Sequence, residues 1–390
     1  MSVWLIEPLD PLIARDGRPA AVGRFDTMEF PYPSMLAGAV RTRMGSEGGA
    51  FTLPKSALGE LREKVLVRGP LLAEVQPEGG ITSWFAPAPH DAVLREENGV
   101  LRLRRLFPRP LAAGEAMDSL PGHGLLPLRT AGIDIYGKPP KNIPSFWSWS
   151  RFERWLTEPQ DEIGVTLADL GIGKLPVETR VHLAIKPDER VGMDGMLFQT
   201  AGLRFLQKDE SPLGMRWFAL SVQVGEARVA GRDLALERQI APLGGERRLA
   251  RWSPASAEWP QMPNEIRKNI VDTRRARLLL LTPAIFENGF LPGWNGQSWP
   301  LGGGVEAIVR AAAVPRPAII SGWNLETGQA KHTRRLAAAG SVYFLELRGG
   351  TDEAIGDWCD AAWLGCVSDN EQDRRDGFGM AVLGTWEAAQ

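Results

Sequence analysis

The sequence predicts an α+β protein with two ferredoxin-like (RRM-like) domains, antiparallel sheets, and long inserted loops or β-hairpins. Three observations lead to this prediction. The chain has 390 residues, more than one small domain usually contains. Its 43 glycines and 30 prolines are spread along the chain, as in short elements joined by long ordered loops. Residues 211–390 follow the order strand, helix, strand, strand, helix, strand, which is the split βαβ arrangement.

The first half shows a blurred version of the same order, so we predict domains over residues 1–210 and 211–390. A strand covers residues 2–14, and a loop with basic residues follows it. A helix then starts at Pro33-Ser34, with Ser34 as its cap, and ends at Gly45. The further elements predicted here are a strand within 101–110 that alternates apolar and basic residues, a helix over 145–156, and two β segments within 178–207.

The second half is easier to divide into elements. Its final helix has Thr351 as the cap and acidic residues in its first turn, where negative charge interacts favourably with the positive end of the helix dipole. A glycine-rich loop at 376–379 then leads into the last strand. The predicted elements are a strand over 214–225, a helix over 231–243, strands over 276–286 and 341–349, a helix over 351–365, and a strand over 380–386.

Composition limits the function classes. The net charge is −2, so the molecule as a whole is not a basic nucleic-acid binder. The two cysteines, Cys359 and Cys366, match no zinc spacing and are interpreted as buried thiols in a reducing compartment. The N-terminus has no basic region followed by a long apolar run, and no segment approaches the length of a membrane span. We therefore expect a cytoplasmic protein that does not enter a membrane.

Catalytic patterns are missing from the sequence. The four histidines stand far apart and match no metal-binding spacing, and neither a GxSxG nor a Walker motif occurs. The glycine-rich stretch 301–309 lacks the lysine of a phosphate-binding loop and is interpreted as a turn before a helix. A general base remains an alternative, with His182 or His332 as the candidates. We expect no catalytic residue, no metal and no cofactor.

Basic residues gather in predicted loops beside glycine or proline, where side chains and backbone N–H groups can approach a phosphate chain together. The alternative for each group is a solvated charged face. Clustering behind Gly244-Gly245 makes the first group the strongest candidate, and the loop after the first strand is predicted to join the same surface. The candidate residues are Arg247, Arg248 and Arg251; Lys331, His332, Arg334 and Arg335; Lys138 and Lys141; Arg374 and Arg375; and Arg15, Arg18 and Arg24.

Several stretches, in this order and spacing, resemble the RAMP superfamily, and more closely the third subunit of the type III-B (Cmr) CRISPR effector complex. The resemblance covers nearly the whole chain. One departure is Ala20, where the family pattern usually has an aromatic residue. The stretches are "EPLDPLIARDGRP", "PYPSMLAGAVRTR", "ETRVHLAIKPDERVGMDGMLF", "LLLLTPAIFENGFLPGW", "LAAAGSVYFLEL" and the terminal "GFG".

The resemblance implies a non-catalytic subunit that binds the repeat-derived 5′ tag of the CRISPR RNA. It also implies contacts with the large Cas10-type subunit and with the backbone RAMP subunits of a heteromeric complex. Gly377, Phe378 and Gly379 would form the glycine-rich loop of RAMP proteins. Glycines there allow positive φ and leave no Cβ between backbone N–H groups and an RNA phosphate. The alternative is a turn that serves folding alone.

The segment 178–198 resembles the β-hairpin that RAMP backbone subunits insert beside the guide as a thumb. In that setting His182 is either an RNA contact or a packed strand residue. Two other functions remain open. One is a RAMP endoribonuclease that processes precursor CRISPR RNA with a histidine as general base. The other is a scaffold subunit that makes no RNA contact of its own.

Overall fold

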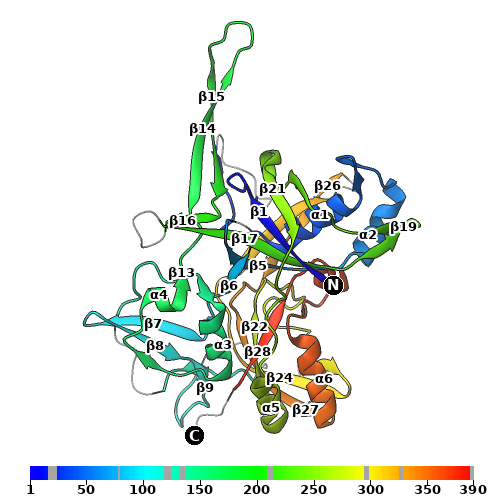
Figure 1. Ribbon diagram of the computed structural model, residues 1–390. Coiled ribbons are helices and arrows are strands. Elements are labelled where there is room, and N and C mark those ends of the chain that lie inside the picture. The colour runs from blue at the N-terminus through cyan, green and yellow to red at the C-terminus, as the bar shows by residue number, and fades with distance from the viewer. Residues whose placement is uncertain are drawn as a thin grey trace. The chain divides into compact units, whose positions relative to one another are not determined.

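The protein is seen here as a computed structural model that describes residues 1–15, 24–77, 80–117, 124–131, 137–208, 214–293, 298–324 and 328–386. Strands outnumber helices, and almost all neighbouring strands are antiparallel (Figure 1). The predicted α+β class with antiparallel sheets is therefore confirmed. The chain divides into two compact units, each built from three separate segments. The first holds 1–83, 174–258 and 319–334, and the second holds 84–173, 259–318 and 335–390.

The predicted domain boundary after residue 210 falls inside the second segment of the first unit. The elements of the first unit come from all three of its segments. They are β1 (Ser2–Pro8), β2 (Arg24–Phe25), α1 (Pro33–Met44), β3 (Ser46–Glu47), β4 (Ala50–Phe51), η1 (Lys55–Ala57), α2 (Leu58–Lys64), β5 (Val67–Val75), β14 (Val177–Ile185), β15 (Gly192–Leu203), β16 (Leu206–Lys208), β17 (Met215–Val224), β18 (Ala227–Val229), β19 (Arg232–Leu234), β20 (Gln239–Pro242), η2 (Gly245–Arg247), β21 (Leu249–Pro254), β25 (Ala318–Asn324) and β26 (Gln329–Leu336).

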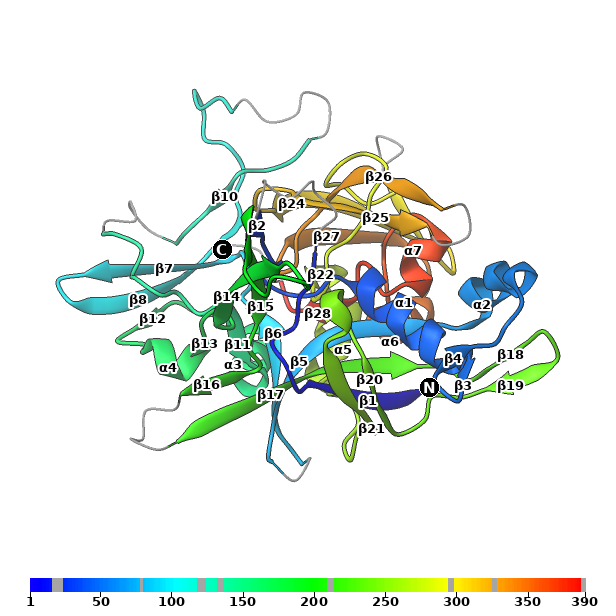
Figure 2. The same cartoon turned by 90° about the horizontal axis from the view of Figure 1, so that it is seen from above.

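The main sheet of the first unit has the order β5-β17-β1-β21-β20, and every neighbouring pair is antiparallel. β1 lies in the middle, with β21 and β20 beside it (Figure 2). Consecutive residues 3–6 of β1 and 71–73 of β5 are all buried. Such continuous apolar runs belong to strands that are covered on both faces. Helix α1 connects β1 to β5 in the chain and packs against β5.

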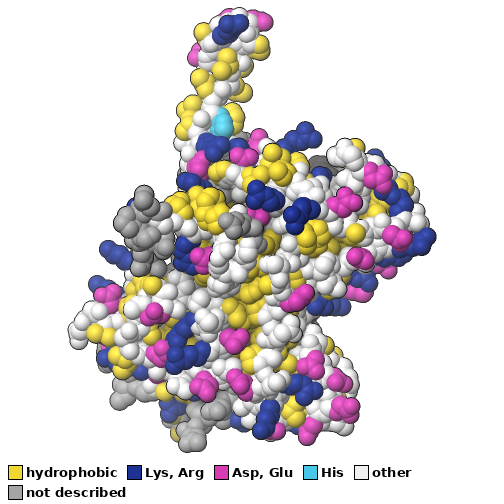
Figure 3. All heavy atoms as spheres, viewed as in Figure 1, with side chains coloured by type: hydrophobic (Ala, Val, Ile, Leu, Met, Phe, Trp, Pro, Cys, Tyr) yellow, Lys and Arg dark blue, Asp and Glu magenta, His cyan; other side chains and the backbone are white. Residues whose placement is uncertain are grey.

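A long hairpin, β14–β15, projects from the first unit (Figure 1). Its strands pair from Val177 opposite Leu203 to Ile185 opposite Gly192, with a bulge before Ile185. A bridge between Leu12 and Leu203 and a short parallel pairing of β15 with β2 join its base to the unit. Hydrophobic side chains remain exposed along its length (Figure 3). The two β segments predicted within 178–207 are confirmed.

The second unit holds the helices α3 to α7. β6 (Ile81–Pro87) crosses from one unit's segment into the other's. The remaining elements are β7 (Ala92–Glu97), β8 (Val100–Arg105), β9 (Phe107–Pro108), β10 (Leu128–Arg129), β11 (Phe146–Ser148), α3 (Trp149–Thr157), β12 (Glu162–Ile163), α4 (Leu167–Leu170), β13 (Gly171–Ile172), α5 (Asn264–Thr273), β22 (Arg275–Leu280), β23 (Trp299–Gly302), β24 (Val305–Ala313), β27 (Val342–Gly349), α6 (Asp352–Ala362), α7 (Glu371–Arg375) and β28 (Ala381–Gly384).

The main sheet of the second unit has the antiparallel order β23-β24-β27-β22-β28. Helix α6 connects β27 to β28 in the chain and packs against α5 and β28. Thr351 caps α6, because its side chain accepts a hydrogen bond of 3.1 Å from the Ala354 N–H. The predicted strands over 276–286, 341–349 and 380–386 and the capped helix after Thr351 are therefore confirmed, with shorter bounds in most cases.

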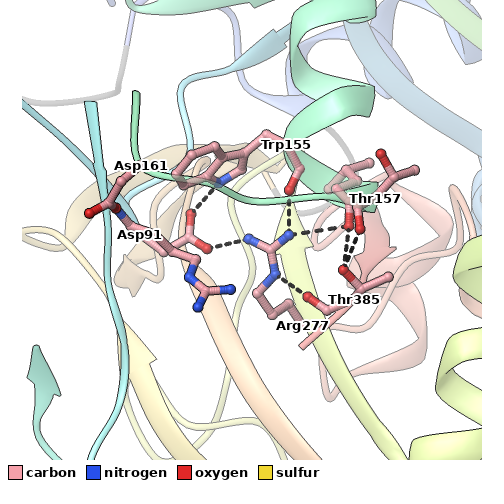
Figure 4. Close-up of polar contacts among 8 residues, drawn as sticks. Asp91, Trp155, Thr157, Asp161, Arg277 and Thr385 are labelled. Atoms are coloured by element: carbon pink, nitrogen blue, oxygen red, sulfur yellow. Dashed lines mark hydrogen bonds and ion pairs between the residues drawn. The ribbon is translucent and has the colours of Figure 1, made fainter. Parts of the chain in front are cut away.

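A buried polar network holds α3, β22 and the end of β28 together (Figure 4). The Arg277 side chain is 1% exposed, and its Nη1 lies 2.5 Å from Oδ2 of the fully buried Asp91. Its Nε and Nη2 donate to the carbonyl oxygens of Thr385 and Trp155, at 2.7 and 2.5 Å. The Trp155 indole N–H donates to the other Asp91 oxygen at 2.8 Å. Burial lowers the pKa of Arg277, and the Asp91 carboxylate opposes that shift.

The predicted helix over 231–243 is wrong, because this segment forms the strands β19 and β20. A turn with positive φ at Ala230 and Gly231 folds β18 onto β19. In β20 and just after it, Ala241 and Leu243 are buried while their neighbours are exposed. That alternation is the period of a strand, and the apolar residues of the segment also fit a helical spacing.

Two further expectations need correction. The stretch 301–309 does turn, with positive φ at Gly302, Gly303 and Gly304, but the strand β24 follows instead of a helix. Helix α1 starts at Pro33 with Tyr32 in the cap position, so Ser34 is not the cap, while the end at Gly45 is confirmed. The helix predicted over 145–156 starts later, because residues 146–148 pair with β6 and β13 as strand β11.

Candidate nucleic-acid interface

Two distant chain segments of the first unit bring predicted basic residues together. The backbone N–H of Gly245 donates to the Ile13 carbonyl oxygen at 2.8 Å, which fixes the loop 244–248 against the chain that follows β1. Arg15 then lies beside this loop, with its Nη2 3.2 Å from Oε1 of Glu246. The predicted proximity of the loop after the first strand and the cluster after Gly244-Gly245 is therefore present. Their common role in RNA binding stays a prediction.

The backbone of this loop is strained in a specific way. Gly244 has φ +74°, and a Cβ there would lie 2.6 Å from the Ile13 carbonyl oxygen, so only glycine fits. Glu246 and Arg247 follow with φ of 57° and 51°, which non-glycine residues rarely adopt. Strained backbone of this kind gathers at functional sites, at a cost of about 1–3 kcal/mol per residue. Here it exposes Arg247 at the tip of the loop.

Arg248 is half-buried, unlike its exposed neighbour Arg247. Its Nε atom is buried and has no hydrogen-bond partner in the part of the chain that the structure describes. Within the same described part, Arg247 makes no hydrogen bond or ion pair. Arg247 is thus the member of the pair whose charge is open to a phosphate.

Arg251 lies one strand further, on β21, directly opposite Glu7 of β1. Its Nη1 is 3.4 Å from the Glu7 carboxylate, and its side chain is 47% exposed. Arg251 also lines a pocket of about 450 Å³ together with Arg180 and Arg204 of the hairpin base. The exposed indole of Trp217 forms part of the same wall. Proteins that bind single-stranded nucleic acid combine cationic side chains, which contact phosphates, with exposed aromatic rings, on which bases stack.

Most of the arginines around this loop and pocket are paired with carboxylates. Arg180 Nε lies 2.5 Å from Glu178 Oε1, and Arg204 Nε lies 3.6 Å from the other Glu178 oxygen. Exposed pairs of this kind contribute about 1 kcal/mol or less. An incoming phosphate can therefore replace the carboxylate at little cost, while the pairs hold the side chains in place.

We expect the Glu246→Gln variant to bind single-stranded RNA more tightly, by up to about fivefold at low salt. The substitution keeps the shape of the side chain and releases Arg15 from its exposed partner, whose attraction is about 1 kcal/mol or less. Arg15→Gln serves as the matched change of opposite sign and is expected to weaken binding. Fluorescence titrations of both variants at several salt concentrations measure this. Equal affinities for both variants would show that the pair lies outside the RNA-binding surface.

His182 is a packed strand residue of the hairpin β14–β15. Its Nε2 lies 2.8 Å from the hydroxyl of Thr200, and its ring stacks on Phe198 with centroids 5.0 Å apart and planes at 15°. Arg180 lies two positions earlier in β14, on the same face. The packing alternative for His182 is thus present, and an RNA contact by the same side chain stays a prediction.

The second basic group lies on a strand, not in the predicted loop. Lys331, His332, Arg334 and Arg335 belong to β26, which pairs with β25. Strand alternation sends Lys331 and Arg335 to one face and His332 and Arg334 to the other. All except the half-buried Arg334 are exposed. A loop was predicted here because residues 331–335 are all polar, so they show no alternation of apolar and polar side chains that would indicate a strand.

The remaining basic candidates are less informative. Lys138 and Lys141 lie in the second unit and are exposed, and the Lys138 carbonyl oxygen accepts a hydrogen bond of 2.9 Å from the Glu96 N–H. Arg24 lies in the short strand β2, opposite Gln199 of β15. Arg18 lies outside the described residues.

Arg374 and Arg375 are the last two residues of helix α7, and both side chains bind within the protein. Arg374 Nη1 donates to the carbonyl oxygens of Ser368 and Asp369, at 2.7 and 2.6 Å. Arg375 pairs with Glu371 at 2.7 Å across one helical turn. The Arg374 bonds fasten α7 to the chain before it, and the Arg375 pair lies within α7, so both arginines have structural partners.

The glycine-rich loop does adopt the expected backbone, with φ of 93° at Gly377 and 79° at Gly379. The expectation that its N–H groups face an RNA phosphate is wrong for this structure. Gly377, Phe378 and Gly379 donate to the carbonyl oxygens of Arg374, Asp373 and Pro283, at 3.1, 3.0 and 2.8 Å. The Phe378 side chain is fully buried. The loop therefore has a role in folding, and an RNA contact by these residues stays a prediction.

Sequence reasoning did not single out Arg180, Arg204 or Trp217, although all three line the pocket next to Arg251. A signal for Arg180 exists in the alternating stretch 178–185, where a basic residue and a histidine share one face. Trp217 gave no signal, because it stands in a strand whose next three residues are all apolar and buried. Its 43% exposure follows from its place near the beginning of β17.

Among the residues that the structure describes, no group of three or more histidine, cysteine, aspartate or glutamate side chains could hold a metal ion. No described helix is long and apolar enough to cross a membrane. Cys359 is buried, as predicted, and burial raises the pKa of its thiol to about 12. Cys366 is only half-buried, which corrects the expectation for that residue.

Comparisons with known proteins agree with the resemblance read from the sequence. The family model described as "CRISPR-associated protein (Cas_Cmr3)" matches residues 4–386. No curated protein matches the chain. Among solved structures, a chain of the type III-B Cmr-beta complex bound to cognate target RNA and AMPPnP matches with 11% identity and a TM-score of 0.46, over 88% of this chain and 86% of that chain. A chain of the Cmr-beta complex bound to cognate target RNA matches with 14% identity and a TM-score of 0.45, over the same shares.

Proposed function

The chain belongs to the Cas_Cmr3 family of CRISPR-associated proteins, and from this premise we propose that it is the RNA-binding subunit that holds the 5′ repeat-derived tag of the CRISPR RNA in a type III-B effector complex. In this role it is non-catalytic and caps one end of a heteromeric assembly. Its protein neighbours are the large Cas10-type subunit and the backbone RAMP subunits. The hairpin β14–β15 lies beside the guide as a thumb.

The single observation that supports RNA binding most strongly is the arginine surface of the first unit. It consists of Arg15 and Arg247 at the loop 244–248, together with Arg251, Arg180 and Arg204 around the pocket. These side chains come from four segments that are far apart in the sequence. In a chain with a net charge of −2, Arg180, Arg204 and Arg251 gather around one pocket that the exposed Trp217 also lines. Local concentration of this kind attracts a polyanion even when the whole molecule does not.

We also propose that both main sheets are ferredoxin-like. In the first unit, β1, β5, β17 and β21 taken as strands one to four give the spatial order 4-1-3-2, and α1 is the first crossover helix. In the second unit, β22, β24, β27 and β28 give the same order, and α6 is the second crossover helix. Each unit lacks the other crossover helix among its described residues. Strand order therefore supports the proposal, and the missing helices distinguish both units from the complete arrangement.

We expect the triple variant Arg15→Gln, Arg247→Gln, Arg251→Gln to bind tag RNA at least tenfold more weakly at low salt, and similarly for different RNA sequences. Removing three phosphate contacts from a single strand lowers the slope of log Kd against log salt by about 2, at about 0.7 per contact. Titrations at four salt concentrations measure both quantities.

The matched control removes the same charge elsewhere in the first unit, by Arg62→Gln, Lys64→Gln and Arg228→Gln near α2 and β18. It is expected to leave the salt slope nearly unchanged. If both triple variants lower the slope equally, RNA binding follows net charge and the arginine surface is not the binding site.

The enzyme alternative is separated by incubating the purified protein with repeat RNA in the absence of metal. The proposal predicts intact RNA. The contacts of His182 with Thr200 and Phe198 support this, because the ring is held in the hairpin by hydrogen bonding and stacking. Defined cleavage products that disappear in His182→Ala or His332→Ala would contradict the proposal and favour an endoribonuclease.

A further inference from the structure

The hairpin β14–β15 exposes a strip of aliphatic side chains that nothing in the described chain covers. Val181, Leu183 and Ile185 alternate along β14 and therefore point to one face. Leu197 lies directly opposite Leu183 on β15 and extends the strip across the pair. These four side chains are 58, 52, 61 and 60% exposed, respectively. Contiguous exposed apolar surface on a soluble protein marks a site of interaction.

The two faces of the hairpin differ in chemistry. The opposite face carries Arg180, the stacked pair His182 and Phe198, and Thr200. These groups offer a cation, aromatic rings and a hydroxyl, which suit a nucleic acid. The aliphatic strip offers neither a charge nor a π face, so RNA gains little from contacting it. The buried centres of protein–protein interfaces consist of apolar side chains of this kind, so the strip is better suited to bind a protein.

The charges at the tip of the hairpin also disfavour RNA. Asp188, Glu189 and Asp194 outnumber Lys186 and Arg190, and Lys186 is paired with Glu189 at 3.3 Å. A slightly acidic tip repels a phosphate chain and is complementary to a basic rim on a partner. In addition, β14 pairs only with β15 within the described residues, so its outer edge is open along the strip. Open apolar edges favour aggregation unless another chain covers them.

We propose that the aliphatic face of the hairpin, formed by Val181, Leu183, Ile185 and Leu197, docks against a neighbouring protein subunit of the effector complex. The surface that receives it is an apolar groove with lysine or arginine at its rim near the hairpin tip. This proposal rests on the proposed assembly but not on RNA binding. The hairpin then separates two roles, with protein contact on one face and RNA contact on the other.

The test uses the variant Val181→Thr, Leu183→Thr, Leu197→Thr of the full chain. Threonine keeps the preference for strands and removes apolar surface, and the replaced side chains are mostly exposed, so the hairpin stays folded. Each other protein subunit of the same effector complex is purified, treated with nuclease, and titrated singly against wild-type and variant chains. We expect the variant to bind one of these subunits at least tenfold more weakly. The matched control is Arg180→Gln with His182→Ala on the opposite face, which should leave that Kd unchanged.

Hydrogen exchange gives an independent readout. Adding the protein subunit should slow exchange of the β14 amides in the wild-type chain, and it should not do so in the threonine variant. The proposal is overturned if wild-type chain binds no single subunit, or if the threonine variant keeps every Kd. It is equally overturned if the variant loses only RNA, or if it abolishes a wild-type homodimer, because the occupant is then RNA or a second copy. Tag binding by the arginine variants is measured separately, so its failure does not imitate these outcomes.

Discussion

Replacing Asp91 by alanine should destabilise the protein by about 3–5 kcal/mol. The change leaves the Arg277 guanidinium charged and buried without its carboxylate, and it also removes the acceptor of the Trp155 indole N–H. Urea unfolding, followed by the fluorescence of the tryptophans, measures the loss of free energy of unfolding.

Two controls show whether the loss comes from burial. Asp360→Ala removes an exposed carboxylate of the same unit, 3.4 Å from Arg267, and should cost about 1 kcal/mol or less. In the background of Asp91→Leu, the further change Arg277→Met should cost much less than it does alone, because no buried charge is then left unpaired. Additive effects of Asp91→Leu and Arg277→Met would mean that the two side chains act independently, against the contacts in Figure 4.

Gly379→Ala should cost about 2–6 kcal/mol, even though it adds a single methyl group. The residue has φ +79°, where a side chain brings about 1–3 kcal/mol of strain. A Cβ would also lie 2.8 Å from the backbone nitrogen of Ser368, and crowding in a packed core adds about 1–3 kcal/mol. Thermal and urea unfolding of the variant measure the sum.

Gly289→Ala is the matched control in the same unit. Its φ is +81°, and nothing lies within 4 Å of the position of an added Cβ. It should therefore show the strain alone and cost less than Gly379→Ala. Equal losses at the two positions would mean that Ser368 moves aside freely. RNA retention by Gly379→Ala should fall only in proportion to its stability, because the N–H groups of this loop bind inside the protein.

Local periodicity and caps allowed much of the fold to be predicted. Helix α6 was identified from Thr351 and the acidic residues after it, since a cap and its partner lie within one turn. The segment 231–243 was misjudged because its apolar residues fit two periods, and pairing with β18 and β21 decided between them. Long-range pairing overrides local preference in such segments.

The candidate site could also be predicted only where the signal is local in the sequence. The arginines after Gly244 form a cluster that the sequence shows directly. Their contact with the first strand's loop is not visible there, because Arg15 and its partner Glu246 are 231 positions apart. The glycine-rich loop at 377–379 was recognised in the sequence, but its contact with Thr282 was not, and that hydroxyl donates to the Gly377 carbonyl oxygen from 95 positions away. No sequence pattern reports which backbone groups such a distant side chain will occupy.

The division of each unit among three chain segments has a consequence for how the protein is made. As the ribosome releases the chain, β1 waits for its neighbours β17 and β21, which end at residues 224 and 254. The main sheet of the second unit closes only when β28, at 381–384, has emerged. Strand pairing over such separations is slow and leaves apolar edges open in the meantime. The nascent chain is therefore a strong candidate for chaperone protection, and fragments cut near residue 210 separate β1 from the strands that complete its sheet.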